Sequence, residues 1–303
     1  MRAQSCSSRG HDDAIDVRSE LPLEQFEREY LLPRRPVILT DAVSDWKALS
    51  KWSPEHLLER IGDKRVPFRG HSEHQDSFRV LSENIAKSLP ENPAVYVENV
   101  DIRGSLPELL DDVTPRIRYA GADWKASRLM PKDWLFPSEM EALFYGGRGS
   151  RLPDLHYDYY GLDAFISQIY GEKEFLVFAP HDTPYLYPRA DDPLRSALDD
   201  FDAPDPERFP LFRRATPIRF TLSAGETLYV PNRWWHTTRM HCVSLTVITT
   251  SWNKANWNRF TAEVLREAWS RRRVRWLAFV PYMYLVGLFL RARDARSTRN
   301  RST

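Results

Sequence analysis

Cysteine is scarce in this chain of 303 residues, with Cys6 and Cys242 as the only two. Two cysteines cannot build a disulfide framework, so we expect a reducing, cytoplasmic location rather than a small disulfide-rich secreted fold. Net charge is also low, at +1, so the molecule as a whole is not built to bind nucleic acid or a membrane by charge. Glycine (12 residues) is outnumbered by proline (22), which indicates ordered turns and irregular loops.

Long hydrophobic runs are missing too. The longest uncharged stretch, WLAFVPYMYLVGLFL at 276–290, is shorter than the roughly 20 apolar residues of a spanning helix, and Pro281 interrupts it. We expect this stretch to be a helix buried in the core or in a homodimer contact. Membrane-surface contact by residues 276–303 is the alternative, since the tail is basic. Residues 1–16 lack an apolar core segment, so we expect a flexible lead-in and no secretory signal.

Hydrophobic spacing in the first half predicts a mixture of short elements. Leu23, Phe26 and Tyr30 recur at helical spacing, and Ser53 is a good N-cap for a helix that ends near Gly62. Further predicted elements are strands at 37–40, 64–70 and 94–102, and helices at 106–112 and 138–147.

From residue 155 onward the sequence pattern is typical of antiparallel strands. Gly171-Glu172 and Ala224-Gly225 are predicted hairpin turns, and HCVSLTVITTSW at 241–252 is a further strand. Residues 181–216, rich in proline and aspartate, are predicted to form an irregular surface loop. This pattern suggests a β-barrel or double sheet. A helix follows, with Phe260, Val264, Leu265 and Trp269 predicted on one face.

The stretch LHYDYYG at 155–161 suggests a metal site. Residues i and i+2 of a strand share a face, so His156 and Asp158 can hold one ion. His236, after the strand GETLYVP, offers a third ligand. Two histidines and one carboxylate form the facial triad of non-haem Fe(II) oxygenases, which leaves positions open for a bidentate 2-oxo acid and dioxygen. The alternative is a hydrogen-bonded sheet histidine beside a turn-capping aspartate.

Lys173 is a candidate partner for the distal carboxylate of a 2-oxo acid. It follows the turn after the His156 strand, and on a strand it shares a face with Phe175 and Val177. A lysine among inward apolar side chains is costly unless an anion meets it. Taken alone, it could equally be a surface lysine of a hairpin.

Together, the segments LHYDYY, QIYGEKEFLVFAP, LYP, GETLYVPNRWWHTT and TTSW resemble the JmjC-type, cupin-like 2-oxoglutarate oxygenases, and in particular the asparaginyl hydroxylase that inhibits hypoxia-inducible factor. The resemblance implies a mainly β fold, a double-stranded β-helix (cupin or jelly-roll) with N-terminal and C-terminal helices. It implies Fe(II) held by His156, Asp158 and His236, and 2-oxoglutarate held by Lys173. It also implies that Trp252 closes the pocket, and that Thr250 belongs with Lys173 and Trp252 to the cosubstrate site.

Some positions depart from the family pattern. Pro153 is displaced and no threonine precedes the first ligand, while Ala164 and Thr250 stand where the family has asparagine. Asparagine is therefore not carried over as the substrate. We expect a lead-in at 1–16, a catalytic domain at 17–253 and a helical segment at 254–303. The expected activity is hydroxylation of a C–H bond in a protein side chain, amino acid or small molecule. A non-catalytic binding module acting through its C-terminal helices, and a zinc or manganese cupin, are the alternatives.

Overall fold

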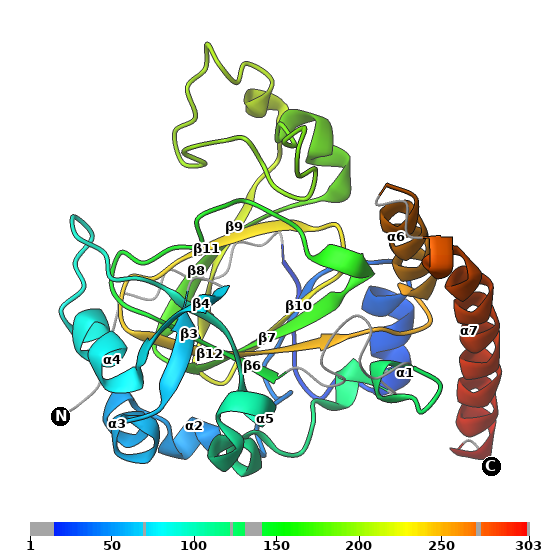
Figure 1. Ribbon diagram of the computed structural model, residues 1–303, viewed down its shortest axis with the longest axis horizontal. Helices are drawn as coiled ribbons and strands as arrows, with labels where there is room; N and C mark the ends of the chain where they lie inside the picture. The colour runs from blue at the N-terminus through cyan, green and yellow to red at the C-terminus, as the bar shows by residue number, and fades with distance from the viewer. Residues whose placement is uncertain (1–14, 69–70, 122–123, 131–140, 271–273, 302–303) are drawn as a thin grey trace.

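The structure is a computed structural model that describes residues 15–68, 71–121, 124–130, 141–270 and 274–301. Two sheets enclose a central space (Figure 1): a larger sheet in the order β1-β2-β10-β7-β12-β6-β5, and a smaller one in the order β11-β8-β9. The predicted fold is confirmed: a double-stranded β-helix with helices at both ends. The predicted flexible lead-in falls almost entirely outside the described residues.

The strands of the two sheets come from all parts of the chain. The large sheet contains β1 (Val17–Arg18), β2 (Val37–Leu39), β5 (Val97–Asp101), β6 (Glu141–Gly146), β7 (Asp163–Tyr170), β10 (Thr227–Val230) and β12 (Ser244–Ser251). The small sheet contains β8 (Glu172–Phe178), β9 (Ile218–Ser223) and β11 (Trp235–Arg239). A separate ribbon pairs β3 (Arg65–Phe68) with β4 (His71–Ser77).

Side-chain alternation gives each sheet two different faces. On β7, Ile166 points into the space between the sheets, whereas Phe165 joins the core on the opposite face. On β8, Phe175 points inward and Phe178 outward. The inner faces form the wall of a cavity, and the outer faces bind the covering segments.

The N-terminal part of the chain covers the outer face of the large sheet (Figure 1). Its helices are α1 (Leu23–Phe26) with a π-helical turn (Glu27–Leu31), α2 (Ala48–Lys51), α3 (Pro54–Ile61), α4 (Phe78–Ala86) and α5 (Ile102–Ser105). The predicted N-cap is confirmed, because Ser53 Oγ accepts a hydrogen bond from the His56 N–H at 3.2 Å. The predicted helix at 106–112 is instead a 3₁₀ helix, Pro107–Val113.

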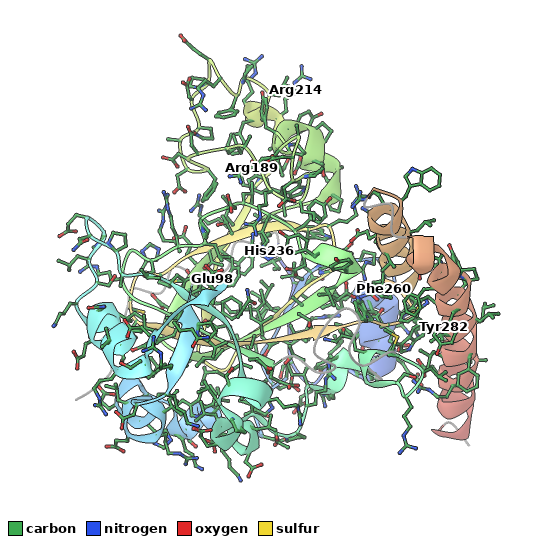
Figure 2. The ribbon with its side chains drawn as sticks, in the orientation of Figure 1. Glu98, Arg189, Arg214, His236, Phe260 and Tyr282 are labelled. Carbon is green, nitrogen blue, oxygen red and sulfur yellow. The ribbon has the colours of Figure 1, made fainter. Side chains whose placement is uncertain are left out.

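The predicted irregular loop at 181–216 is confirmed. Apart from 3₁₀ turns at Pro180–Tyr185 and Phe212–Arg214 it lacks regular structure, and it projects beyond the sheets, carrying Arg189 and Arg214 (Figure 2). Its apolar side chains nevertheless have a core of their own on the outer face of the small sheet, formed by Leu194, Leu198 and Phe209 with Leu176, Phe178 and Trp235. We call residues 181–216 the insert.

The C-terminal helices α6 (Trp257–Ser270) and α7 (Val274–Arg301) pack against each other at one side of the sheets (Figure 1). The Trp257 Nε1–H donates to the Met283 carbonyl at 3.0 Å. At Gly287 a Cβ would lie 2.3 Å from Trp257 Nε1, so the close approach requires glycine there. Among the described helices, none has the length and apolar composition needed to span a bilayer.

Five sequence-based expectations are wrong. The helix predicted at 138–147 is not found in its described part: residues 141–146 are β6, whose pairing with β12 and β5 in the core outweighs local helix propensity. Neither Gly171-Glu172 nor Ala224-Gly225 is a hairpin turn, because β7 and β8 belong to different sheets, and so do β9 and β10. The chain crosses between the sheets at both points.

The other two concern the C-terminal helices. Leu265 (41% exposed) and Trp269 (76%) do not share the buried face of Phe260 and Val264. Pro281 does not interrupt α7, which runs through it. A proline removes one backbone hydrogen bond, and the buried residues beyond it, Met283 among them, hold the helix against α6.

Candidate metal centre

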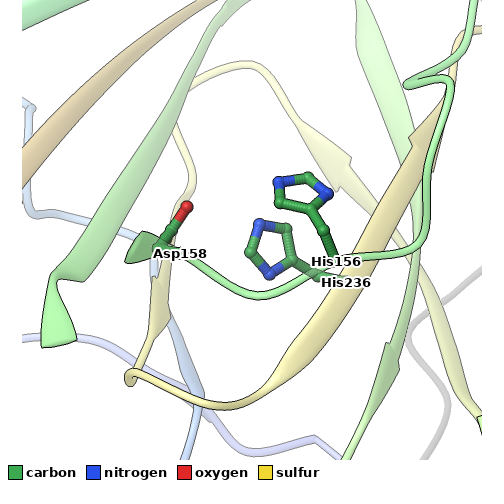
Figure 3. A group of neighbouring side chains, drawn as sticks. All are labelled: His156, Asp158 and His236. Atoms are coloured by element: carbon green, nitrogen blue, oxygen red, sulfur yellow. The ribbon is translucent and has the colours of Figure 1, made fainter. Parts of the chain in front are cut away.

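His156, Asp158 and His236 meet in the space between the sheets (Figure 3). One potential ligand atom from each lies within 4.8 Å of the others. His236 is on β11, but His156 and Asp158 are not on a regular strand, as the alternation argument assumed. His156 instead forms an isolated bridge to His236: its N–H donates to the His236 carbonyl at 3.2 Å, and the reciprocal bond is 2.7 Å. The 3₁₀ turn Tyr159–Gly161 follows Asp158.

Backbone carbonyls orient both imidazoles. His156 Nδ1 lies 3.1 Å from the Asp154 carbonyl, and His236 Nδ1 lies 3.0 Å from the Trp234 carbonyl. A carbonyl only accepts hydrogen bonds, so each Nδ1 carries the proton and each Nε2 keeps a lone pair. This is the tautomer that ligates a metal through Nε2.

Burial sets the charge of the centre. Desolvation lowers the pKa of His156 to about 3, and the neighbouring His236 contributes to the shift, so the His156 imidazole is neutral at neutral pH. Desolvation also raises the pKa of Asp158; the buried Asp163 adds to the rise and His236 opposes it. A divalent cation offsets the cost of burying the Asp158 carboxylate, because it favours a neutral imidazole and an ionised carboxylate. The donor set therefore fits Fe(II).

A cavity of about 480 Å³ opens beside the three ligands. It is within the size range of small-molecule sites. The positions where the sequence departs from the family pattern, Pro153, Ala164 and Thr250, all lie in its wall. Other lining residues include Tyr96, Glu98, Phe144, Tyr159, Ile166, Phe175 and Arg195. Glu98 and His236, both labelled in Figure 2, line this cavity.

Lys173 lies in the cavity wall and is 2% exposed. Its predicted inward direction, shared with Phe175 and Val177, agrees with the structure. Its amine donates to Tyr96 Oη at 2.9 Å and lies 5.3 Å from the Tyr96 ring centroid. Burial lowers the pKa of Lys173 to about 7 and raises that of Tyr96 well above 10. The two groups together offer one cation and one hydroxyl to an anion.

The two remaining predicted residues differ in position. Thr250 lines the cavity, and its Oγ1 accepts a hydrogen bond from Lys125 Nζ at 2.8 Å. Trp252 lies behind the cavity wall rather than in it: its ring is 4.0 Å from that of Phe260 on α6, and its Nε1–H donates to the Tyr160 carbonyl at 3.0 Å. Trp252 thus supports the turn that follows Asp158.

The insert reaches the segment that carries His156 and Asp158. The segment before Asp158 pairs with it as well as with β11, through Tyr157 N–H to the Leu194 carbonyl (3.0 Å) and Ser196 N–H to the Leu155 carbonyl (2.8 Å). Arg195 lines the cavity and forms an ion pair with Asp154 at 2.5 Å. Two residues before the first ligand, Asp154 therefore fixes both the insert and the His156 ring.

Other histidines lie elsewhere. His241 lies beyond the end of β11, so strand alternation does not set its direction, and it pairs with Glu174 at 2.6 Å. The side chain of His181 is 76% exposed on the insert.

Comparisons with known proteins agree with this site. The chain is 28% identical over 233 residues to lysine-specific demethylase 8 of Xenopus tropicalis, covering 74% of this chain and 50% of that protein. It is 26% identical over 250 residues to the human bifunctional peptidase and (3S)-lysyl hydroxylase JMJD7 (70% and 75%). It is 27% identical over 229 residues to tRNA wybutosine-synthesizing protein 5 of Gallus gallus (70% and 69%). Several relatives are longer, and the chain spans about half the length of lysine-specific demethylase 8 and of similar matches.

A cupin-like domain family matches residues 22–258, which is most of the chain. This match and the JmjC-named relatives confirm the resemblance that the ordered motifs indicated. The chain belongs to the cupin-like domain family and is similar to its JmjC members.

Proposed function

We propose that the protein is an Fe(II)- and 2-oxoglutarate-dependent dioxygenase that hydroxylates a C–H bond of a protein side chain, an amino acid or a small molecule. The observation that carries the proposal is one cavity with two complementary features in its wall: the three ligands within 4.8 Å of one another, and the buried Lys173. Structural zinc sites have four protein ligands, whereas a three-ligand site beside a cavity leaves positions open for reactants.

The ligand residues would hold the ion through the Nε2 atoms of His156 and His236 and a carboxylate oxygen of Asp158. When bound, Fe(II) with 2-oxoglutarate and dioxygen supplies oxidative decarboxylation of the cosubstrate to succinate and carbon dioxide, with insertion of one oxygen atom into a C–H bond. The protein holds the ring nitrogens in place through the Asp154 and Trp234 carbonyls. Those fixed rings leave the ligand set little freedom to rearrange during turnover.

Lys173 and Tyr96 would bind the distal carboxylate of 2-oxoglutarate. A carboxylate beside Lys173 favours the charged amine, so binding restores the charge that burial disfavours. The Tyr96 hydroxyl, whose pKa burial raises well above 10, stays protonated and can donate a hydrogen bond to the same carboxylate. Apolar neighbours such as Phe175 exclude water from this end of the cavity.

The proposal specifies the primary substrate only by its chemical class. Relatives carry names as different as demethylase, lysyl hydroxylase and tRNA-modifying protein, so kinship does not choose among substrates. Removal of an N-methyl group begins with the same hydroxylation. The insert is also proposed to help select the substrate, because its residue Arg195 lies in the cavity wall. The scarcity of cysteine supports a cytoplasmic location.

A second candidate function is a non-catalytic module that binds a partner through α7. It is favoured by apolar side chains on the outer side of α7: Leu285, Leu288 and Phe289 are each about 60% exposed. The same face supports the proposed homodimer contact, and the basic tail supports the alternative contact with a membrane surface. Sedimentation of wild type and Leu288→Glu, with and without anionic vesicles, separates these contacts.

Anaerobic titration with Fe(II) and 2-oxoglutarate tests the enzyme proposal. A visible metal-to-ligand charge-transfer band is expected in wild type and in His181→Ala, a matched control at an exposed histidine. It should vanish in His156→Ala. No band in the wild type would refute the proposal, and metal analysis would then identify a zinc or manganese cupin. Succinate release, screened against peptides, free amino acids and a lysate with mass detection of one added oxygen, identifies the substrate.

A further inference from the structure

A buried carboxylate lies next to the metal centre. Asp163, the first residue of β7, is 0% exposed. Its oxygens accept hydrogen bonds from Arg34 Nη1 (2.8 Å) and Nη2 (2.6 Å), Tyr229 Oη (3.1 Å), Asn232 N–H (2.9 Å) and Asn253 Nδ2 (3.0 Å). These donors come from three separate parts of the chain. A charged group satisfied in this way is rigid, and removing its cation leaves a costly buried charge.

One connection runs from this carboxylate to Asp158. The backbone of Asn232 donates to Asp163, and the Asn232 side chain donates from Nδ2 to the Asp158 carbonyl at 3.1 Å. The turn that follows Asp158 contains Tyr160 at φ 51°, in the left-handed region that non-glycine residues rarely adopt. Such a conformation persists only where the surrounding structure holds it. The hydrogen bond from Asn232 to the Asp158 carbonyl helps to hold this turn.

A second connection runs from Arg34 to His236. The Arg34 carbonyl accepts the Trp234 Nε1–H at 2.8 Å, and the Trp234 carbonyl faces His236 Nδ1 at 3.0 Å. Arg34 is itself left-handed, at φ 62°. This backbone conformation lets its carbonyl meet Trp234 while its side chain meets Asp163.

We propose that Arg34 is a positioning residue of the metal centre, holding the Asp158 segment through its side chain and the His236 segment through its carbonyl. Arg34 lies more than a hundred residues from either ligand in the sequence, in the turn before β2. The inference rests on the proposed function only in that the three ligands bind a divalent metal. It requires neither 2-oxoglutarate nor a substrate.

Binding of Mn(II) alone, followed by electron paramagnetic resonance of the full chain, tests the inference. Arg34→Met removes the guanidinium and keeps the carbonyl. Loss of an outer-shell partner typically weakens metal affinity by about 10- to 100-fold, so we expect at least a tenfold rise in Kd. Arg35→Met is the matched control, because Arg35 is 55% exposed and pairs with the peripheral Asp16. Its Kd should stay within about twofold of wild type, as expected for a surface pair.

Asn232→Ala keeps the test valid where Arg34→Met fails to fold. It removes only the contact with the Asp158 carbonyl and leaves the backbone bond to Asp163. A Kd raised about tenfold in this folded variant supports the inference, again by the outer-shell rule. Unchanged Mn(II) affinity in the folded variants, even with lower melting temperatures, overturns it. Failure of wild type to bind Mn(II) overturns the proposed function, and this inference with it.

Discussion

Replacing Lys173 by methionine should stabilise the metal-free protein while abolishing 2-oxoglutarate binding. The amine is 2% exposed, and burial lowers its pKa from 10.5 to about 7. Methionine is similar in length and carries no charge, so it fits the apolar wall beside Phe175 without the desolvation cost. Before any ligand binds, the buried lysine therefore lowers the free energy of unfolding.

The magnitude follows from proton linkage. The folded state binds fewer protons than the unfolded state between pH 7 and 10.5, so the free energy of unfolding of wild type rises with pH in this window. A shift of this size costs the folded state about 4 kcal/mol at pH 7 and about 2 kcal/mol at pH 9. The Lys173→Met variant avoids both costs. Its Tyr96 hydroxyl loses a donor, which costs about 1 kcal/mol, but equally at both pH values.

Urea unfolding of wild type and Lys173→Met at pH 7 and pH 9 measures the difference. The advantage of the variant should be about 2 kcal/mol larger at pH 7 than at pH 9. With 2-oxoglutarate and Mn(II) present, a cosubstrate concentration of 100 Kd should add about 2.7 kcal/mol to wild type alone. An advantage that does not change with pH would refute the argument, since it would show that burial does not shift the pKa of Lys173.

Three further outcomes are expected. Trp252→Phe should lower the free energy of unfolding by about 1 kcal/mol through loss of the hydrogen bond to the Tyr160 carbonyl; an unchanged urea midpoint would contradict it. Gly287→Val should cost about 1–3 kcal/mol, because the side chain meets Trp257 at the α6–α7 contact; thermal unfolding at the wild-type temperature would show that the helices adjust freely. Mn(II) at 100 Kd should add about 2.7 kcal/mol to wild type and nothing to Asp158→Ala, and equal stabilisation of both would place the metal elsewhere.

Features with a local cause were predictable from the sequence. Strand alternation placed Lys173 inward with Phe175, and the order of the motifs predicted that His156, Asp158 and His236 come together. Prediction was wrong where contacts with distant segments outweigh the local preference for a helix or a strand. Residues 141–146 are rich in helix formers, yet both neighbouring strands pair with them.

Contacts between distant segments could not be predicted. Nothing in the residues around Tyr96 indicates that its hydroxyl meets Lys173, 77 positions away. The same holds for Arg34, whose partner Asp163 is 129 positions away. The predicted grouping of His156 and Asp158 with His236 is present, although isolated bridges from His156 to Arg195 and His236 replace the strand on which the prediction relied.

The pairing of the insert with the ligand segment limits how this protein can diversify. A loop that only covers a cavity can be exchanged for another without changing the chemistry beneath it. Here the backbone at Leu194 and Ser196 is bonded on either side of His156. We therefore expect changes of length or sequence near these residues to disturb the proposed metal site as well as the cavity wall. Variation that spares the metal should concentrate in the part of the insert furthest from Arg195.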